Sequence, residues 1–368
     1  MKHLIGIILA FTLLSAPVAF SQNFDWLRPL PAVFFKPDTV SVYVIGDIMS
    51  HGQQIKSAFR NGSADYSTFL LHLSSRIQKA DVAIGNMEFP LGGKPYSGYP
   101  AFSAPDEYAK YLSDLGFDVL LTANNHILDK GSDGLTRTLD QLDSLPVLHT
   151  GCARADTLLT PLIIKTKGVS IGIVNFTYGT NLGPTKKEPV VARQRKEEVK
   201  RLMDACRGAD FVFVFPHWDL EYKHTHSAKT EEWARWLVSE GANLIIGTHP
   251  HVVQDCSLIE GTPVFYSIGN AVSNQNQLPT RLELGLRIRI IRPFGEAPRL
   301  LDVQAEYLWC TKPDMLEDSY ATIPVKDFME HPELWKQPGD YNDMLSTYQA
   351  VQTATSIPDG YCITLESE

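Results

Sequence analysis

The sequence predicts an α/β fold built on parallel strands, and two patterns support this prediction. Short apolar, β-branched runs alternate with segments whose apolar residues recur every three or four positions, as at 66–79 and 135–145. This alternation is typical of parallel strands joined by helical crossovers. Acidic, amide and imidazole side chains follow the ends of the runs. In open α/β sheets, functional side chains gather outside the carboxyl ends of the strands, so we expect one site at that edge.

The first two predicted strands, residues 41–45 and 81–84, both end in candidate metal ligands. The side chains that follow them are those of Asp47, His51, Asn86 and Glu88. Taken alone, Asp47 also fits a helix cap and Glu88 a solvated loop charge. The same residue types at two strand ends favour a shared function.

The third predicted strand, residues 117–121, is followed by a polar cluster. Its members are Asn124, Asn125, His126 and Asp129. Either asparagine is also compatible with a turn that needs left-handed backbone.

The fourth and fifth predicted strands, residues 210–215 and 243–246, deliver histidines. The candidates are His217, with Trp218 and Glu221 behind it, and the pair His249 and His251 around Pro250. Neutral imidazole is the commonest protein ligand for transition metals, and the proline restricts the backbone between the two rings. His217 is also compatible with a core histidine. Together, the five strand ends predict one metal site.

Aromatic residues near these ends are candidates for substrate contacts. Trp218 is the best pocket candidate, because it follows a predicted ligand. Tyr96 and Tyr99 lie in the Gly/Pro-rich loop 92–104, which is long for a simple connection and indicates a mouth or a lid.

The motifs resemble those of the bacterial capsule-synthesis CapA family, which is linked to poly-γ-glutamate and related to the calcineurin-like metallophosphatases. They occur in the family's order between about Val42 and Gln275: Gly46-Asp47, Gly85-Asn86-Met87-Glu88, Asn124-Asn125-His126, His217-Trp218, His249-Pro250-His251 and Gly269-Asn270. The resemblance implies a four-layer α/β/β/α metallophosphatase-like sandwich and one or two divalent ions. Carboxylate and imidazole ligands without thiolate favour Mn, Fe, Zn or Co.

The resemblance also implies individual roles. The expected metal ligands are Asp47, Glu88, Asn125, His217, His249 and His251. His126 is expected to act as general acid, with Asp129 as a second catalytic candidate. Further candidates for the site are His51, Asn86, Asn124, Trp218, Glu221 and Asn270. Ordinary phosphoesterases place a histidine two residues after the first aspartate and a bridging aspartate in the second motif. His51 follows Asp47 by four, and Asn86 with Glu88 replaces the bridging aspartate, which leaves the number of metals open.

Three functions are compatible with these residues. The first is a metal-dependent hydrolase or transferase acting on an acyl or amide bond of poly-γ-glutamate, capsule or another cell-envelope polymer. The second is a phosphoester hydrolase of the metallophosphatase type. The third is a non-catalytic protein with a structural metal site, whose partners would be capsule-assembly proteins.

Residues 1–21 are typical of a signal peptide, with Lys2, an apolar stretch at 4–14 and small residues before Gln22. The mature protein is therefore expected to be exported, periplasmic or extracellular, and soluble without a transmembrane span. A formal net charge of −9 argues against nucleic acid as a partner, because phosphate binding needs a basic surface.

The expected domain covers residues 22–312, and residues 313–368 are expected to form a helical and irregular appendage on it. Strict apolar alternation at 282–290 and in much of 300–309 predicts an antiparallel pair. The chain has five cysteines, which allow one or two disulfides and leave at least one thiol unpaired.

Overall fold

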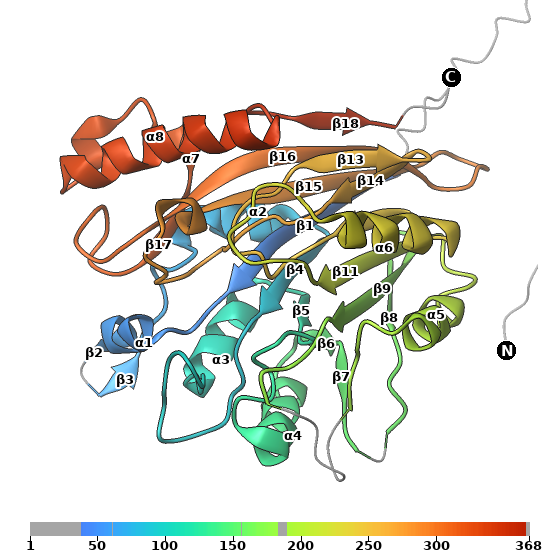
Figure 1. Cartoon of the computed structure of the whole chain (residues 1–368), viewed down its shortest axis with the longest axis horizontal. Coiled ribbons are helices and arrows are strands. Elements are labelled where there is room, and N and C mark those ends of the chain that lie inside the picture. Colours follow the sequence, from blue (N-terminus) through green and yellow to red (C-terminus); the bar gives the residue numbers. More distant parts are fainter. Residues whose placement is uncertain (1–37, 61, 156, 183–189, 366–368) are drawn as a thin grey trace, which may run out of the picture. The chain divides into compact units, whose positions relative to one another are not determined.

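The computed structural model describes residues 38–60, 62–155, 157–182 and 190–365 (Figure 1). The predicted signal peptide at 1–21 lies outside the described residues. Contacts divide the chain into the units Met1–Lys36 and Pro37–Glu368, and all elements below belong to the second unit.

The first sheet is half parallel and half antiparallel. Its order is β17-β16-β15-β1-β4-β5-β6, with β18 also paired to β16. The parallel strands are β1 (Asp38–Ile48), β4 (Val82–Met87), β5 (Val119–Leu121) and β6 (Leu148–Thr150). The antiparallel strands are β15 (Leu282–Arg292), β16 (Arg299–Thr311), β17 (Ala321–Pro324) and β18 (Cys362–Thr364). The antiparallel pair predicted at 282–290 and 300–309 is therefore confirmed.

The second sheet has the order β13-β14-β12-β11-β9-β8. Its parallel strands are β9 (Val169–Thr177), β11 (Phe211–His217), β12 (Leu244–Ile246) and β14 (Thr262–Phe265). The antiparallel edges are β8 (Leu162–Thr166) and β13 (Cys256–Ile259). Two short ribbons pair β2 (Phe59–Arg60) with β3 (Ser63–Ala64), and β7 (Cys152–Ala153) with β10 (Val190–Val191).

The two sheets pack face to face, and helices cover their outer faces. Val42 and Val44 of β1 belong to the apolar core that also contains Phe213 of β11, so this core lies between the sheets. Tyr43 and Ile45 point the other way and pack in a separate core, as the two-residue period of a strand requires. This second core includes side chains of α2 (Ser74–Lys79) and α3 (Asp106–Leu115). A third core joins the second sheet to α4 (Gly131–Asp143), α5 (Lys196–Ala205) and α6 (Ala228–Ser239). The predicted four-layer α/β/β/α fold is confirmed.

The helix predicted at 66–79 is shorter than its apolar spacing indicated. A 3-10 turn at Leu71–Leu73 precedes α2, and the residues before it form turns. The Leu70 amide donates to the Tyr111 hydroxyl across 3.0 Å, so a tertiary contact replaces the bond a helix would make. Tyr66, Phe69 and Leu70 are nevertheless buried, which accounts for the pattern.

The C-terminal segment contributes strands as well as helices. It contains α7 (Val325–Phe328) and α8 (Pro338–Thr355), and its strands β17 and β18 both pair with β16 (Figure 1). The division of the chain at residue 312 stays a prediction. All five cysteines are free, and none of the described helices is long and apolar enough to cross a membrane.

The parallel strands of both sheets end on the same side of the molecule (Figure 1). Asn175 of β9 helps to join these ends. Its amide oxygen accepts from the Ala123 backbone across 2.7 Å, and its amide nitrogen donates to the Phe215 carbonyl across 2.8 Å. The loop after β5 is thereby attached to the second sheet, which brings residues 124–126 towards the end of β11.

Candidate metal centre

Asp47 links three strand ends. The register between β1 and β4 shifts between Ile45 and Asp47, and such an irregularity re-aims the side chain that follows it. Gly46 permits the close approach of the neighbouring loop, because an added Cβ would lie 2.1 Å from the Gly269 carbonyl oxygen. The buried Asp47 carboxylate accepts from the Asn86 amide at 2.6 Å and from the His249 backbone at 3.1 Å.

Glu88 is a fully buried carboxylate without a hydrogen-bond partner among the described residues. Both of its side-chain oxygens lack one, and its exposed fraction is 0%. Burial and the nearby Asp47 carboxylate raise the pKa of Glu88 well above its usual range. Imidazole nitrogens lie 3.8 Å away on His217 and 3.9 Å away on His251. A buried carboxylate that receives no hydrogen bond is costly, so this position favours a bound cation.

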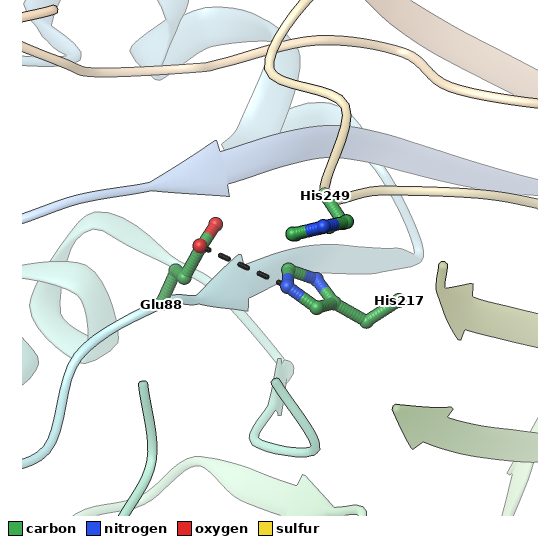
Figure 2. A group of neighbouring side chains, drawn as sticks. All are labelled: Glu88, His217 and His249. Carbon is green, nitrogen blue, oxygen red and sulfur yellow. Dashed lines mark ion pairs between the residues drawn. The ribbon is translucent and has the colours of Figure 1, made fainter. Parts of the chain in front are cut away.

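His249 and His251 leave the tip of β12 in unusual backbone conformations. Their φ angles are 97° and 60°, both in the left-handed region that non-glycine residues rarely adopt. Strain of about 1–3 kcal/mol per such residue persists mainly at functional sites. The conformation gathers the rings: the centroid of His249 lies 4.8 Å from that of His217 and 5.8 Å from that of His251 (Figure 2 shows His249 with His217 and Glu88).

His217 lies at the end of β11 with both ring nitrogens engaged. Nε2 lies 2.8 Å from the Asn125 amide oxygen, and Nδ1 lies 2.9 Å from the Thr248 hydroxyl. Burial and the adjacent imidazoles hold the pKa values of His217 and His249 well below their usual range. Neutral rings are the form that binds metal ions.

The potential ligand atoms form overlapping groups whose members all lie within 4.8 Å of one another. The groups are Glu88, His217 and His249; Asp47, Glu88 and His251; and Glu221, His249 and His251. Glu88 belongs to the first two and is placed to bridge them. This carboxylate–imidazole set, with the unpartnered Glu88 oxygens and the unpartnered Nδ1 of His249, fits one or two divalent cations.

His126 and Asp129 form a buried pair beside this cluster. His126 Nδ1 lies 2.7 Å from Asp129 Oδ2, and the Phe102 backbone amide donates to the same oxygen across 2.8 Å. The His126 ring also packs against that of Phe102, with centroids 4.5 Å apart. These two contacts fix the orientation of the His126 ring, and Asp129 engages its Nδ1 rather than its Nε2.

The family model described as bacterial capsule synthesis protein PGA_cap matches residues 41–275. The chain belongs to this family. The matched residues contain every side chain of the candidate metal centre, from Asp47 to His251.

Two curated relatives of this PGA_cap family member carry the name CapA. The chain is 29% identical to the PGA biosynthesis protein CapA of Bacillus subtilis, over 67% of each chain. It is 28% identical to the capsule biosynthesis protein CapA of Bacillus anthracis, over 66% of this chain and 62% of that protein. The alignment with the second relative thus leaves more than a third of that protein unmatched.

The fold of this PGA_cap protein is that of metallophosphatase-type nucleotidases. A solved structure of a Staphylococcus aureus protein assigned as a 5'-nucleotidase aligns with a TM-score of 0.50 at 16% identity. The alignment covers 78% of this chain and 54% of that one. At this identity the likeness shows the fold alone.

Three further candidates contact predicted ligands or the loop that carries His126. Asn86 donates to Asp47, and Asn270 Oδ1 lies 2.9 Å from His251 Nδ1. Asn124 donates to the Met87 carbonyl and accepts from the His126 backbone, so both ends of its side chain hold the loop. These three asparagines therefore hold the predicted ligands and the His126 loop in position.

His51 and Glu221 lie at the margin of the cluster. His51 is absent from the ligand groups found among the described residues, and its Nδ1 lies 3.0 Å from the Gln54 side chain. Burial lowers the pKa of His51 to about 4. Its ring meets Phe102 edge-on, with centroids 5.3 Å apart. Glu221 is 4.0 Å from His251 and partly exposed, so it lies on the solvent side.

The prediction of Trp218 as a pocket residue is wrong. Its exposed fraction is 0%, and its indole donates to the Tyr266 carbonyl across 2.9 Å. It packs in the core between the second sheet and its helices. A strand's alternation explains this, because the side chain after His217 points to the opposite face.

Two residues that follow β9 contact the cluster although they are not among the predicted site residues. Asn181 Nδ2 lies 3.2 Å from His126 Nδ1, and the Asn181 backbone donates to the Asn125 carbonyl across 2.8 Å. The Tyr178 ring centroid lies 4.6 Å from that of His249. The run Val169–Thr177 is as apolar as the other strands, so the strand-end rule would have found both residues.

Thr248 orients His217, and we expect Thr248→Val to weaken metal binding. Valine keeps the shape but removes the hydroxyl, and losing such a supporting contact typically costs about 10–100-fold in metal affinity. Competition with a fluorescent zinc chelator measures this loss. Thr248→Ser keeps the hydroxyl and should bind nearly as the parent does. Equal affinities of the valine variant and the parent would show that the contact does not orient a ligand.

Proposed function

We propose that the protein is an exported, metal-dependent enzyme that acts on an amide bond of an anionic cell-envelope polymer, with poly-γ-glutamate as the first candidate. The observation that carries the proposal is the unpartnered Glu88 carboxylate, shared by two groups of ligand atoms beside the His126–Asp129 pair. A purely structural metal site would have no need of that pair. The names of two relatives, one a PGA biosynthesis protein and the other a capsule biosynthesis protein, support the substrate class.

The residues divide into two roles. Asp47, Glu88, His217, His249 and His251, with Asn125 beside them, would hold the ions. When bound, divalent ions polarise a substrate oxygen and lower the pKa of water, which supplies the nucleophile. Asp129 contacts His126 at Nδ1, and His126 would give a proton to the departing amine. Hydrolysis then adds water across the C–N bond, leaving a carboxylate and an amine; transfer to a second amine would form a new amide.

Exposed aromatic residues lie beside the histidines of this site. Tyr99, Tyr178 and Tyr222 are exposed, with rings 6.4 Å from His126, 4.6 Å from His249 and 6.0 Å from His251, respectively. Tyr99 comes from the loop 92–104 that the sequence indicated as a mouth or lid. Tyrosines offer apolar area and a hydroxyl to an extended chain, which suits a polymer better than a small ion.

Phosphoester hydrolysis is the second candidate. Side chains at the positions that the metallophosphatase resemblance implies, among them Asp47, Asn125 and His217, converge in space. The same charged site would stabilise a phosphoryl group.

The assay that decides between these functions uses the purified full chain with Mn²⁺, Zn²⁺ or Co²⁺. Poly-γ-glutamate and muropeptides are tested for new amino groups, and bis-p-nitrophenyl phosphate for nitrophenol release. Amine release that disappears in His217→Ala supports the proposal. Nitrophenol release alone would favour phosphoester hydrolysis. No product from any substrate, with metal bound and the fold intact, would contradict an enzymatic role.

A further inference from the structure

A cavity of about 590 Å³ lies on the α2 side of the first sheet and shares no residue with the candidate metal centre. Cavities of roughly 300–1,000 Å³ accommodate ligands of drug or short-peptide size. It is lined by α2, β15, β16, α7 and the segment 359–362, and the residues used below include Lys79, Arg287, Gln304, Lys326, Asp359 and Cys362.

The sheet places three of these side chains in one row. Arg287 of β15 is the register partner of Gln304 of β16, and Gln304 is the partner of Cys362 of β18. Side chains of directly paired residues share a face of the sheet. Because neighbouring strands lie about 4.8 Å apart, Cys362 is about 10 Å from Arg287 across the sheet.

The wall opposite this row is built from paired charges. Nε of Arg76 donates to both carboxylate oxygens of Glu306, at 2.8 and 2.9 Å, and Nη2 donates to Asp327 at 2.9 Å. The Tyr43 hydroxyl donates to Glu306 across 2.9 Å from below. An added Cβ at Gly285 would lie 2.6 Å from that hydroxyl, so glycine keeps this part of the cavity open.

Three cations of the cavity are left without an anionic partner. No ion pair or side-chain hydrogen bond within the described residues engages Lys79, Arg287 or Lys326. Among the described lining residues, Asp359 is the one acid that does not pair with Arg76. The cavity therefore carries an excess of positive charge in a chain whose formal net charge is −9.

We infer that this cavity is a second binding site, which holds a linear chain of carboxylate-bearing residues away from the metal centre. A guanidinium pairs with a carboxylate through two parallel hydrogen bonds, and the lysines add flexible positive charge. Asp359 can accept a backbone N–H of the same chain. A polymer whose repeat contains one carboxylate and one amide would present a carboxylate to the cations and an N–H to Asp359. Only the identity of the polymer rests on the proposed function.

The reactivity of the exposed Cys362 thiol can be used to measure occupancy of the cavity, because the other cysteines are buried or half-buried. The labelling rate of the full chain with uncharged N-ethylmaleimide is measured with and without an oligomer of γ-glutamate, and Cys362→Ser identifies the Cys362 signal. We expect saturating oligomer to slow labelling at least fivefold. Arg287→Ser should abolish this protection, whereas Arg299→Ser, which removes an exposed arginine of β16 outside the cavity, should leave it unchanged.

Two comparisons separate binding in this cavity from binding at the metal centre and from non-specific shielding of the thiol. Protection should persist in His217→Ala, so a chain without catalytic activity can still support the inference. Polyethylene glycol and inorganic phosphate, at matched size or ionic strength, should give little protection. No protection by the oligomer, protection that survives in Arg287→Ser, or equal protection by phosphate or the neutral polymer would overturn the inference.

Discussion

Replacing Glu88 by glutamine should stabilise the metal-free protein and remove most of the stabilisation that divalent ions provide. The carboxylate is fully buried and lacks a hydrogen-bond partner, and a buried group of this kind costs about 1–3 kcal/mol or more. A neutral amide removes the charge and can donate to the nearby Asp47. It cannot bridge two groups of ligands, so the benefit should reverse when Mn²⁺ is added.

Urea unfolding with chelator and with excess Mn²⁺ measures both effects. Glu283→Gln is the matched control, because Glu283 is also a fully buried glutamate with one unpartnered oxygen but lies outside the ligand groups. Its effect on the free energy of unfolding should be the same in both conditions. A Glu88→Gln protein that is less stable without metal and still gains the parent's stabilisation from Mn²⁺ would argue against Glu88 as a ligand.

Replacing His126 by glutamine should lower kcat while leaving the metal content unchanged. Loss of a positioned general acid costs about 10²–10⁴-fold in rate. The His126 ring contacts Asp129 and Phe102 and belongs to no group of ligand atoms within the described residues. Steady-state kinetics on whichever substrate is turned over, with elemental analysis of the same sample, separates catalysis from metal binding.

His149→Gln provides the comparison for this variant. His149 also pairs with an aspartate, Asp143 at 2.9 Å, but it lies on β6 away from the cluster. Its kcat should match that of the parent. If His126→Gln retains full activity, the pair is structural and a role as a non-catalytic assembly protein gains support. If it loses its metal, the histidine is a ligand and its assigned role is wrong.

The strands, and the edge of the sheets at which the site lies, could be predicted from the local sequence pattern. Runs such as 41–45 and 210–215 are apolar at alternate positions or throughout, because the surroundings of their side chains repeat along the strand. The end of each strand is predicted where this apolar pattern stops. The residue types after those ends predicted that Asp47, Glu88 and the histidines would meet. Their roles as ligands stay predictions until an ion is observed.

The supporting contacts could not be predicted in the same way. Asp129 accepts from the Phe102 backbone, and Asn175 joins Ala123 to β11, through loops whose approach depends on the packing of whole sheets. The burial of Trp218 depends on which face of the second sheet α6 covers. Likewise, the cavity beside Arg287 forms only when β18 pairs with β16, far along the chain.

The most direct test of the metal centre is anomalous diffraction from crystals of the full chain grown with Mn²⁺. The structure predicts an ion bound by Glu88, His217 and His249, and a second bound by Asp47, Glu88 and His251, with ligand bonds of about 2.0–2.3 Å. Glu88 should contact both ions if two are present. An empty cluster at saturating Mn²⁺, or ions bound without Glu88, would contradict the account.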